Sequence, residues 1–193
     1  MALRDFALVS GSYPSLTRDP GIAAFVLLEH HAVTGPWVVM VQKEVADRLC
    51  SPPGSREYGG VTAVMSRVRA VSRVCAAPRG CFLPAPRVDS AVIRLDPRPQ
   101  PRGEVGDAAG FQQLVRAAFQ QRRKVLSNAL TSLAGREAAL RWCEVAGVDP
   151  GIRPERLGPE EFAALQRARE AEAAAGITGG SSGDAESGDA GAA

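Results

Sequence analysis

Short apolar runs separated by turn residues dominate the first third of the chain. The segments at 6–9 and 37–41 are continuously apolar, which is typical of strands buried on both faces of a covered sheet. Between them, from Pro20 to His31, apolar residues recur at helical spacing. This pattern predicts two neighbouring parallel strands joined by a helix. A short helix is predicted next, over residues 42–49.

Two further segments, at 68–74 and 88–95, alternate apolar and polar residues and flank a proline-rich loop at 77–87. Two alternating strands joined by a loop of this length predict an antiparallel pair added to the edge of the sheet. The segment at 97–106 (PRPQPRGEVG) then has the composition of a linker.

The pattern becomes helical beyond this segment. Apolar residues from Phe111 to Leu133 follow the spacing of one amphipathic helix of about six turns. A second helix, over 137–146, is expected to end at Gly147 in a capping position, and Gly158-Pro159 is expected to open a third. The sequence therefore predicts an α/β fold with four parts: a mixed sheet domain over 1–96, a linker over 97–106, a helical domain over 107–170 and a disordered acidic tail over 171–193.

The composition is that of an ordinary globular chain, with 193 residues of which 45% are hydrophobic. Its four cysteines, at 50, 75, 81 and 143, form no Cys-x-x-Cys pair, which argues against a zinc knuckle or a disulfide scaffold and favours the reducing cytoplasm. No apolar run reaches the roughly 18–20 residues of a membrane helix, and residues 1–15 lack the layout of a secretory signal. We therefore expect neither a membrane nor a metal as a partner.

The net charge of +2 conceals an uneven distribution. Residues 176–193 carry three acids and no base, so the preceding 175 residues carry +5. Only two of the 23 basic residues are lysine, which leaves 21 arginines. Arginine suits phosphate because its planar guanidinium can contact two oxygens at once, although a GC-rich genome gives the same bias.

Three segments together resemble a known family. They are VVMVQKEVADRL with PPGSREYG at 38–59, CFLPAPRVDSAVIRL at 81–95 and FQQLVRAAFQQRRKVLSNAL at 111–130, and GVDPGIRPERLGPEEFAAL at 147–165 extends the likeness. In this order and spacing they resemble the small-subunit ribosomal RNA adenine dimethyltransferases, the KsgA/RsmA family, and more distantly the Erm-type macrolide-resistance methylases. The resemblance runs from about residue 20 to about residue 170.

The resemblance implies a fold and a reaction. The family transfers two methyl groups from S-adenosylmethionine to N6 of each of two adjacent adenines in a ribosomal RNA hairpin. Its fold is a Rossmann-like methyltransferase sheet followed by a small helical domain, so this chain would hold the C-terminal part of that sheet, with parallel strands and an antiparallel edge pair. A glycine-rich turn and a later acid hold the cofactor in such sheets. A loop of Asn, an apolar residue, Pro and an aromatic residue grips the adenine, which leaves its stack to reach the loop.

This sequence departs from the family pattern at its start. No Gly-x-Gly-x-Gly turn is present, so the chain resembles a member that is incomplete at its N-terminus, and S-adenosylmethionine is not expected to bind to this chain alone. The adenine loop would fall at Ser12, Tyr13, Pro14 and Ser15, where only Pro14 agrees. Ser12 stands in place of the Asn and Ser15 in place of the aromatic residue. We therefore expect a degenerate catalytic loop and a chain that is inactive by itself.

Two other groups of residues match functional positions of the family. Phe82, in Phe-Leu-Pro-Ala-Pro, matches a second aromatic residue that stacks on the adenine; a Phe that anchors the loop to the core is the alternative. Arg122, Arg123 and Lys124, with Arg116 nearby in the same predicted helix, match a basic stretch near the RNA. Phosphate contact and a plain solvated helix face both account for this cluster.

By resemblance, the chain is expected to act on small-subunit ribosomal RNA or a pre-ribosomal subunit, as a cytoplasmic adenine dimethyltransferase. The alternative is a catalytically dead RNA-binding or ribosome-assembly remnant that uses the basic helical part and no cofactor. A helix-turn-helix DNA-binding protein is disfavoured, because no basic recognition helix stands out between residues 111 and 170.

Overall fold

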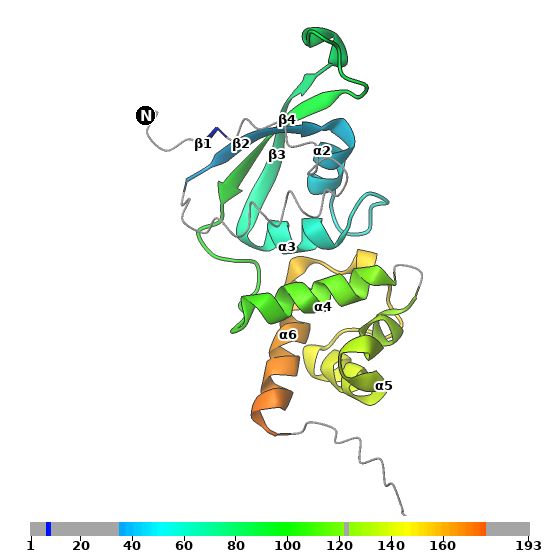
Figure 1. Ribbon diagram of the computed structural model, residues 1–193. Helices are drawn as coiled ribbons and strands as arrows, with labels where there is room; N and C mark the ends of the chain where they lie inside the picture. Colours follow the sequence, from blue (N-terminus) through cyan, green and yellow to red (C-terminus); the bar gives the residue numbers. More distant parts are fainter. Residues whose placement is uncertain (1–6, 9–34, 122–123, 177–193) are drawn as a thin grey trace, which may run out of the picture.

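A computed structural model describes residues 7–8, 35–121 and 124–176 (Figure 1). The predicted adenine loop at Ser12, Pro14 and Ser15, and the basic residues Arg122 and Arg123, lie outside the described residues.

The described strands form one sheet in the order β1-β2-β4-β3. Strand β1 (Ala7–Leu8) pairs in parallel with β2 (Trp37–Gln42), and β4 (Ser90–Pro97) pairs antiparallel with β2 on one side and with β3 (Arg69–Ala77) on the other. The predicted antiparallel pair at the sheet edge is confirmed, since β3 is the edge strand of the described sheet. A larger parallel sheet stays a prediction.

Helices α2 (Lys43–Leu49) and α3 (Gly60–Val68) pack on the sheet, and the predicted helix over 42–49 is confirmed. Buried and less buried side chains alternate along β4, so every second side chain points to one face of the sheet. On that face they pack against buried side chains of β2, α2 and α3. The buried residues of this core are Trp37, Val39, Ala46, Leu49, Met65, Ala91, Ile93 and Leu95.

The rest of the described chain is helical. It contains α4 (Ala108–Gln120), α5 (Leu126–Ala146), a short 3-10 helix η3 (Pro154–Arg156) and α6 (Pro159–Ala174). The predicted ends are confirmed: Gly147 caps α5 with φ of +66°, a value that favours glycine, and Pro159 begins α6.

The prediction of one helix from Phe111 to Leu133 is wrong. The chain leaves helical geometry at Gln121, and a new helix begins at Leu126. The amide of Leu126 donates to the carbonyl of Ile152 at 2.8 Å, so the start of α5 is held by a loop that lies 26 residues later in the chain. The spacing of apolar residues does not predict such a contact, because the helical spacing continues through residues 121–126.

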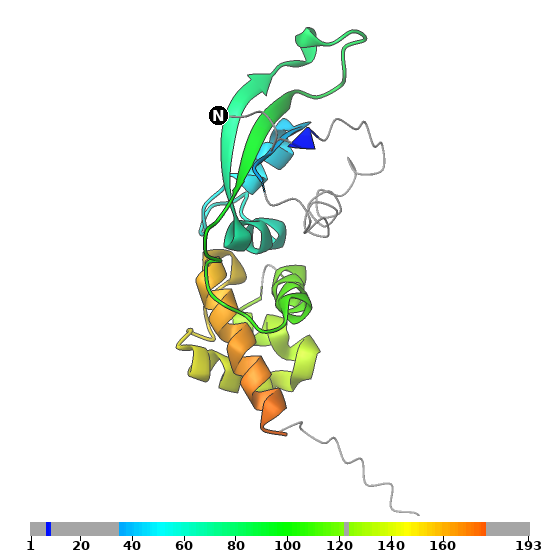
Figure 2. The ribbon, with the colours of Figure 1, turned by 90° about the vertical axis from the view of Figure 1, so that its left-hand side faces the viewer.

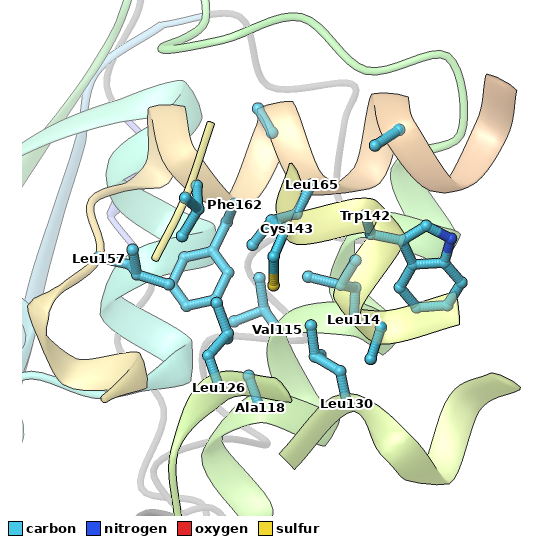
Figure 3. Close-up of a cluster of buried hydrophobic side chains, with 14 of the residues drawn as sticks. Leu114, Val115, Ala118, Leu126, Leu130, Trp142, Cys143, Leu157, Phe162 and Leu165 are labelled. Atoms are coloured by element: carbon cyan, nitrogen blue, oxygen red, sulfur yellow. The ribbon is translucent and has the colours of Figure 1, made fainter. Parts of the chain in front are cut away.

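The helical part shares its core with α3 (Figure 3). Phe162 of α6 lies at the centre of one end of this cluster, close to Leu157 and Leu126, while Trp142 of α5 lies at the other end. Tyr58 and Ala63, from the first half of the chain, belong to the same cluster. The predicted boundary between a sheet domain and a helical domain is therefore bridged by buried side chains, and the division into domains stays a prediction.

The segment at 97–106 connects β4 to α4 along the surface of α3. The amide of Arg98 donates to the carbonyl of Val68 at 2.9 Å, and the amide of Arg102 donates to that of Arg67 at 2.8 Å. Its composition predicts a linker, and these two hydrogen bonds fix the segment to the end of α3.

Candidate nucleic-acid interface

Strands β3 and β4 form a hairpin whose connection projects beyond the sheet at the top of Figure 2, since β2 pairs with β4 as far as Ser90. A register shift between Arg73 and Cys75 marks a bulge in β3, a feature that bends a strand and increases its twist. The connection at 78–89 begins with the 3-10 helix η2 (Arg79–Cys81) and continues with Phe82. We refer to residues 78–89 as the hairpin tip.

Asp89 fixes the base of the hairpin tip. Its carboxylate accepts a hydrogen bond from the amide of Arg79 at 2.9 Å, and its carbonyl accepts one from the amide of Lys43, the first residue of α2, at 2.9 Å. Asp89 thus joins the two ends of the hairpin tip and connects the tip to the start of α2.

Phe82 lies immediately after η2 and is half-buried. Its amide donates to the carbonyl of Arg79 at 3.3 Å, which closes the 3-10 turn. The following residue, Leu83, is fully exposed, with a relative accessible surface of 101%, and Val88 on the returning side is 47% exposed. The aromatic residue that the sequence singled out is therefore placed at the free end of the hairpin, next to an uncovered leucine.

The arginines at the base of the hairpin serve the fold. Arg67 donates to the carbonyl of Gly103 at 3.0 Å and lies over the ring of Phe111. Arg69 is buried and stacks on Trp37. Burial lowers the pKa of both guanidinium groups, but arginine stays protonated because its ordinary pKa is so high.

Arg73, farther along β3, forms an ion pair with Asp47 of α2. Asp47 also accepts a hydrogen bond from Lys43 at 2.9 Å, four residues earlier in the same helix. This hydrogen bond lowers the pKa of the Asp47 carboxyl group, and the pairing with Arg73 lowers it further, so that together they outweigh the opposing effect of burial. The three residues link the hairpin to α2.

Only Arg79 and Arg87 of the hairpin arginines lie in the tip, where both are exposed. Within the described part of the chain, neither side chain has an ion pair or a hydrogen-bond partner. Their guanidinium groups are available to an external anion.

The second candidate group lies at the far end of α4. Arg116 occupies the exposed face of that helix, opposite the buried Leu114, Val115 and Ala118. Lys124 is exposed and lies in the connection between α4 and α5, where its amide donates to the carbonyl of Gln121 at 2.8 Å. It is therefore not on a continuous helix face with Arg116, as the single-helix prediction required.

The structure does not gather these candidates into one pocket. In Figure 1 the hairpin tip lies at the top, with α3 below it and α4 lower still, so Phe82 and Arg116 belong to elements that lie well apart. An elongated ligand such as an RNA hairpin suits two separated contact regions better than a small molecule does.

The glycine pair that leads into α3 does not form a phosphate-binding turn. Gly59 and Gly60 begin the helix after a loop rather than after a strand. A Cβ atom on Gly60 would lie 3.3 Å from the Phe119 ring, so a side chain already fills that space. This glycine pair is therefore not a turn that could receive the methionine end of S-adenosylmethionine.

Two other kinds of site are missing from the described ranges. No three His, Cys, Asp or Glu side chains come together there as metal ligands. None of the helices in those ranges combines the length and the apolar character that a membrane crossing requires.

Comparison with known proteins decides the family. Residues 20–167 match the ribosomal RNA adenine dimethylase family. The chain belongs to this family. The prediction drawn from the three ordered segments is confirmed.

Curated relatives and solved structures agree with this assignment. The chain is 45% identical over 149 residues to ribosomal RNA small subunit methyltransferase A of Bacillus mycoides (strain KBAB4) and of Bacillus cereus (strain B4264), a match that covers 75% of this chain and 51% of each relative. This member of the dimethylase family thus spans about half the length of those relatives.

Among solved structures, a dimethyladenosine transferase from Plasmodium falciparum superposes with a TM-score of 0.67 at 21% identity, covering 88% of this chain and 68% of that one. The 23S rRNA methyltransferase ErmE superposes with a TM-score of 0.54 at 20% identity, covering 86% and 64%. At these identities the likeness concerns the fold alone, and it confirms the predicted α/β class.

Sequence reasoning assigned no role to three residues of the candidate interface: Arg79, Leu83 and Arg87. A signal was present, because residues 78–88 contain two arginines and no acid. The exposure of Leu83 had no such signal, since a leucine beside Phe82 and Pro84 is as typical of a buried anchor as of a free side chain.

Proposed function

We propose that this dimethylase family member contributes to the N6-dimethylation of two adjacent adenines in small-subunit ribosomal RNA, with S-adenosylmethionine as the methyl donor. The family match over residues 20–167 carries this proposal. The position of Phe82 at the end of a projecting, acid-poor hairpin tip supports it, because a stacking residue must reach a base that has left its helix.

Specific roles follow for the residues that match the family. Phe82 stacks on the target adenine, and the degenerate loop at Ser12, Pro14 and Ser15 lies on the other side of the base. Arg116, Arg122, Arg123 and Lys124 contact RNA phosphates. The exposure of Arg116 and Lys124 supports this role, since a phosphate contact needs a charge that water can still reach in the free protein.

We propose that the 193-residue chain by itself holds no S-adenosylmethionine and is inactive alone, because its sequence contains no Gly-x-Gly-x-Gly turn and the described glycine pair is filled by Phe119. In the family reaction the cofactor supplies the methyl group. The chain's own contribution is to bind and orient RNA.

The organisation proposed for the chain is a sheet domain over 1–96, a linker over 97–106 and a helical domain from 107 onward. The tail predicted to begin at 171 is corrected by the structure, because α6 continues to Ala174. With small-subunit ribosomal RNA or a pre-ribosomal subunit as its partner, we propose a cytoplasmic location for the protein.

Salt-dependent RNA binding tests the proposal. The probe is a short RNA hairpin with two adjacent adenines in its loop, titrated with the chain at several salt concentrations. Replacing Arg122, Arg123 and Lys124 together by Ala should flatten the salt dependence by up to about three phosphate contacts, and adding Arg116→Ala should flatten it further.

The matched control replaces Arg56, Arg136 and Arg167, three exposed arginines elsewhere, so that the net charge changes equally. The control should keep most of the slope. Equal slopes for the two triple variants would show that the cluster is an ordinary solvated surface, and an unsubstituted chain that does not bind the RNA would overturn the proposed function.

A further inference from the structure

The hairpin tip presents one uncovered apolar side chain between two basic ones. Leu83 has no protein cover at all, whereas its neighbour Phe82 is half-buried. A single exposed leucine is common on protein surfaces. This one stands at the end of a projecting element, which distinguishes it from a leucine on a helix face such as Leu140 of α5, which is only 37% exposed.

The charge around Leu83 is positive. Arg79 and Arg87 lie on the two sides of the Phe-Leu-Pro-Ala-Pro segment, and residues 78–88 contain no acid. The nearest carboxylate in the sequence, that of Asp89, already accepts the amide hydrogen of Arg79 at 2.9 Å. An acidic, elongated ligand is therefore complementary to the tip.

The tip is also held in shape. Pro78, Pro84 and Pro86 each fix one backbone torsion, and η2 and Asp89 close the base with hydrogen bonds. A rigid loop loses little conformational entropy when its end is inserted into a partner. A small, rigid apolar projection between cations is how proteins commonly wedge apart stacked bases, with Leu, Phe, Ile, Met or Pro as the inserted residue.

We propose that Leu83 is a wedge residue that enters the RNA base stack where the target adenine has left it, while Arg79 and Arg87 contact the phosphates on either side. This inference rests on the proposed function and adds a positioning role to it. Phe82 holds the extruded base, and Leu83 prevents that base from returning to its stack.

The test separates base extrusion from RNA binding. One of the two adjacent adenines in the RNA hairpin is replaced by 2-aminopurine, whose fluorescence rises when the base leaves its stack. Saturating unsubstituted chain should raise the fluorescence. Leu83→Ala should bind within roughly threefold of the unsubstituted affinity but lose more than about half of the fluorescence rise, since the apolar wedge supplies the unstacking.

Three variants sharpen the result. Leu83→Phe should keep the fluorescence rise, because a larger apolar side chain still fills the gap. Val145→Ala, at a position on α5 that is 74% exposed, should change neither binding nor fluorescence. Arg79→Ala with Arg87→Ala should instead weaken binding and flatten its salt dependence by about two phosphate contacts.

The outcomes are distinct. Binding with an undiminished fluorescence rise in Leu83→Ala overturns the wedge and leaves the proposed function standing. No binding by the unsubstituted chain overturns both. If Leu83→Ala abolishes a dimer of the chain that sedimentation detects without RNA, then the tip contacts a second copy, and the wedge is again overturned. Urea unfolding of each variant checks that the fold is intact.

Discussion

The guanidinium carbon of Arg69 lies 3.7 Å from the centre of the Trp37 ring. Its Nη1 also donates to the carbonyl of Gly35 at 3.0 Å and to that of Leu95 at 3.3 Å. Trp37 is 3% exposed and Arg69 8% exposed, so this cation and its ring are both withdrawn from water. Arg69 thus joins the start of β2 to the start of β3 and to the end of β4.

The first prediction concerns this contact. Arg69→Leu removes the cation–ring interaction and leaves two carbonyl groups without their donor, so it should lower the free energy of unfolding by about 2–3 kcal/mol. Arg69→Lys should recover only part of the loss, because an ammonium group cannot stack as a planar guanidinium does. Urea unfolding measures both, and Arg79→Leu at the exposed tip is the control. Equal stability of Arg69→Leu and the control would contradict the role of this cation.

Gly103 provides a second prediction. Its φ of +78° disfavours any other residue, and an added Cβ would lie 2.5 Å from the Cβ of Ala163 in α6. Gly103→Ala should therefore destabilise the protein by roughly 2 kcal/mol or more and loosen the linker at 97–106. Gly80→Ala is the matched control, since a Cβ there meets nothing within 4 Å. Thermal unfolding compares the two variants. Similar midpoints would show that the linker can move away from α6 without loss of stability.

The third prediction is a pH dependence that arises from Glu170. Burial tends to raise the pKa of this carboxyl group, but hydrogen bonds from the Asp107 amide, the Gln166 side chain and the Gly106 amide outweigh it, and the net pKa lies below its ordinary value of 4.5. A lowered pKa in the folded state means that the unfolded chain binds the proton more tightly. The stabilisation is therefore complete above about pH 4.5 and is lost as the pH falls through the lowered pKa.

Glu170→Gln should consequently be less stable than the unsubstituted chain near neutral pH, and the difference should shrink as the solution is acidified below about pH 4.5. Urea midpoints measured across this range test the effect. Glu144→Gln, at an exposed position of α5, is the control and should follow the unsubstituted chain at every pH. A difference that stays constant down to low pH would show that Glu170 acts by packing rather than by charge.

The cysteines give a fourth prediction. Burial raises the pKa of the Cys143 thiol to about 11, whereas Cys75 and Cys81 are exposed. Because the thiolate is the reactive form, iodoacetamide at neutral pH should label Cys75 and Cys81 well before Cys143. Mass spectrometry of the folded chain follows the order, and labelling in urea should remove the difference. Early labelling of Cys143 in native buffer would mean that the core around α5 and α6 opens readily.

The sequence by itself determined the local elements of this protein. The apolar run that includes Trp37 and the alternation that ends at Leu95 are both strands, and Gly147 and Pro159 mark helix ends as their chemistry requires. These features depend on residues near one another in the chain. The order of the three motif segments likewise identified the family before any contact was known.

Tertiary structure decided how individual residues are used. Nothing local distinguishes Arg67 and Arg69, which support the fold, from Arg79 and Arg87, which lie free at the hairpin tip, because the difference depends on which rings and carbonyls lie across the sheet. The break before Leu126 has the same cause: its amide is satisfied by Ile152, a residue that only the folded chain brings near. Spacing along a chain records which residues are apolar, whereas the function of a charged residue depends on the partners that folding places beside it.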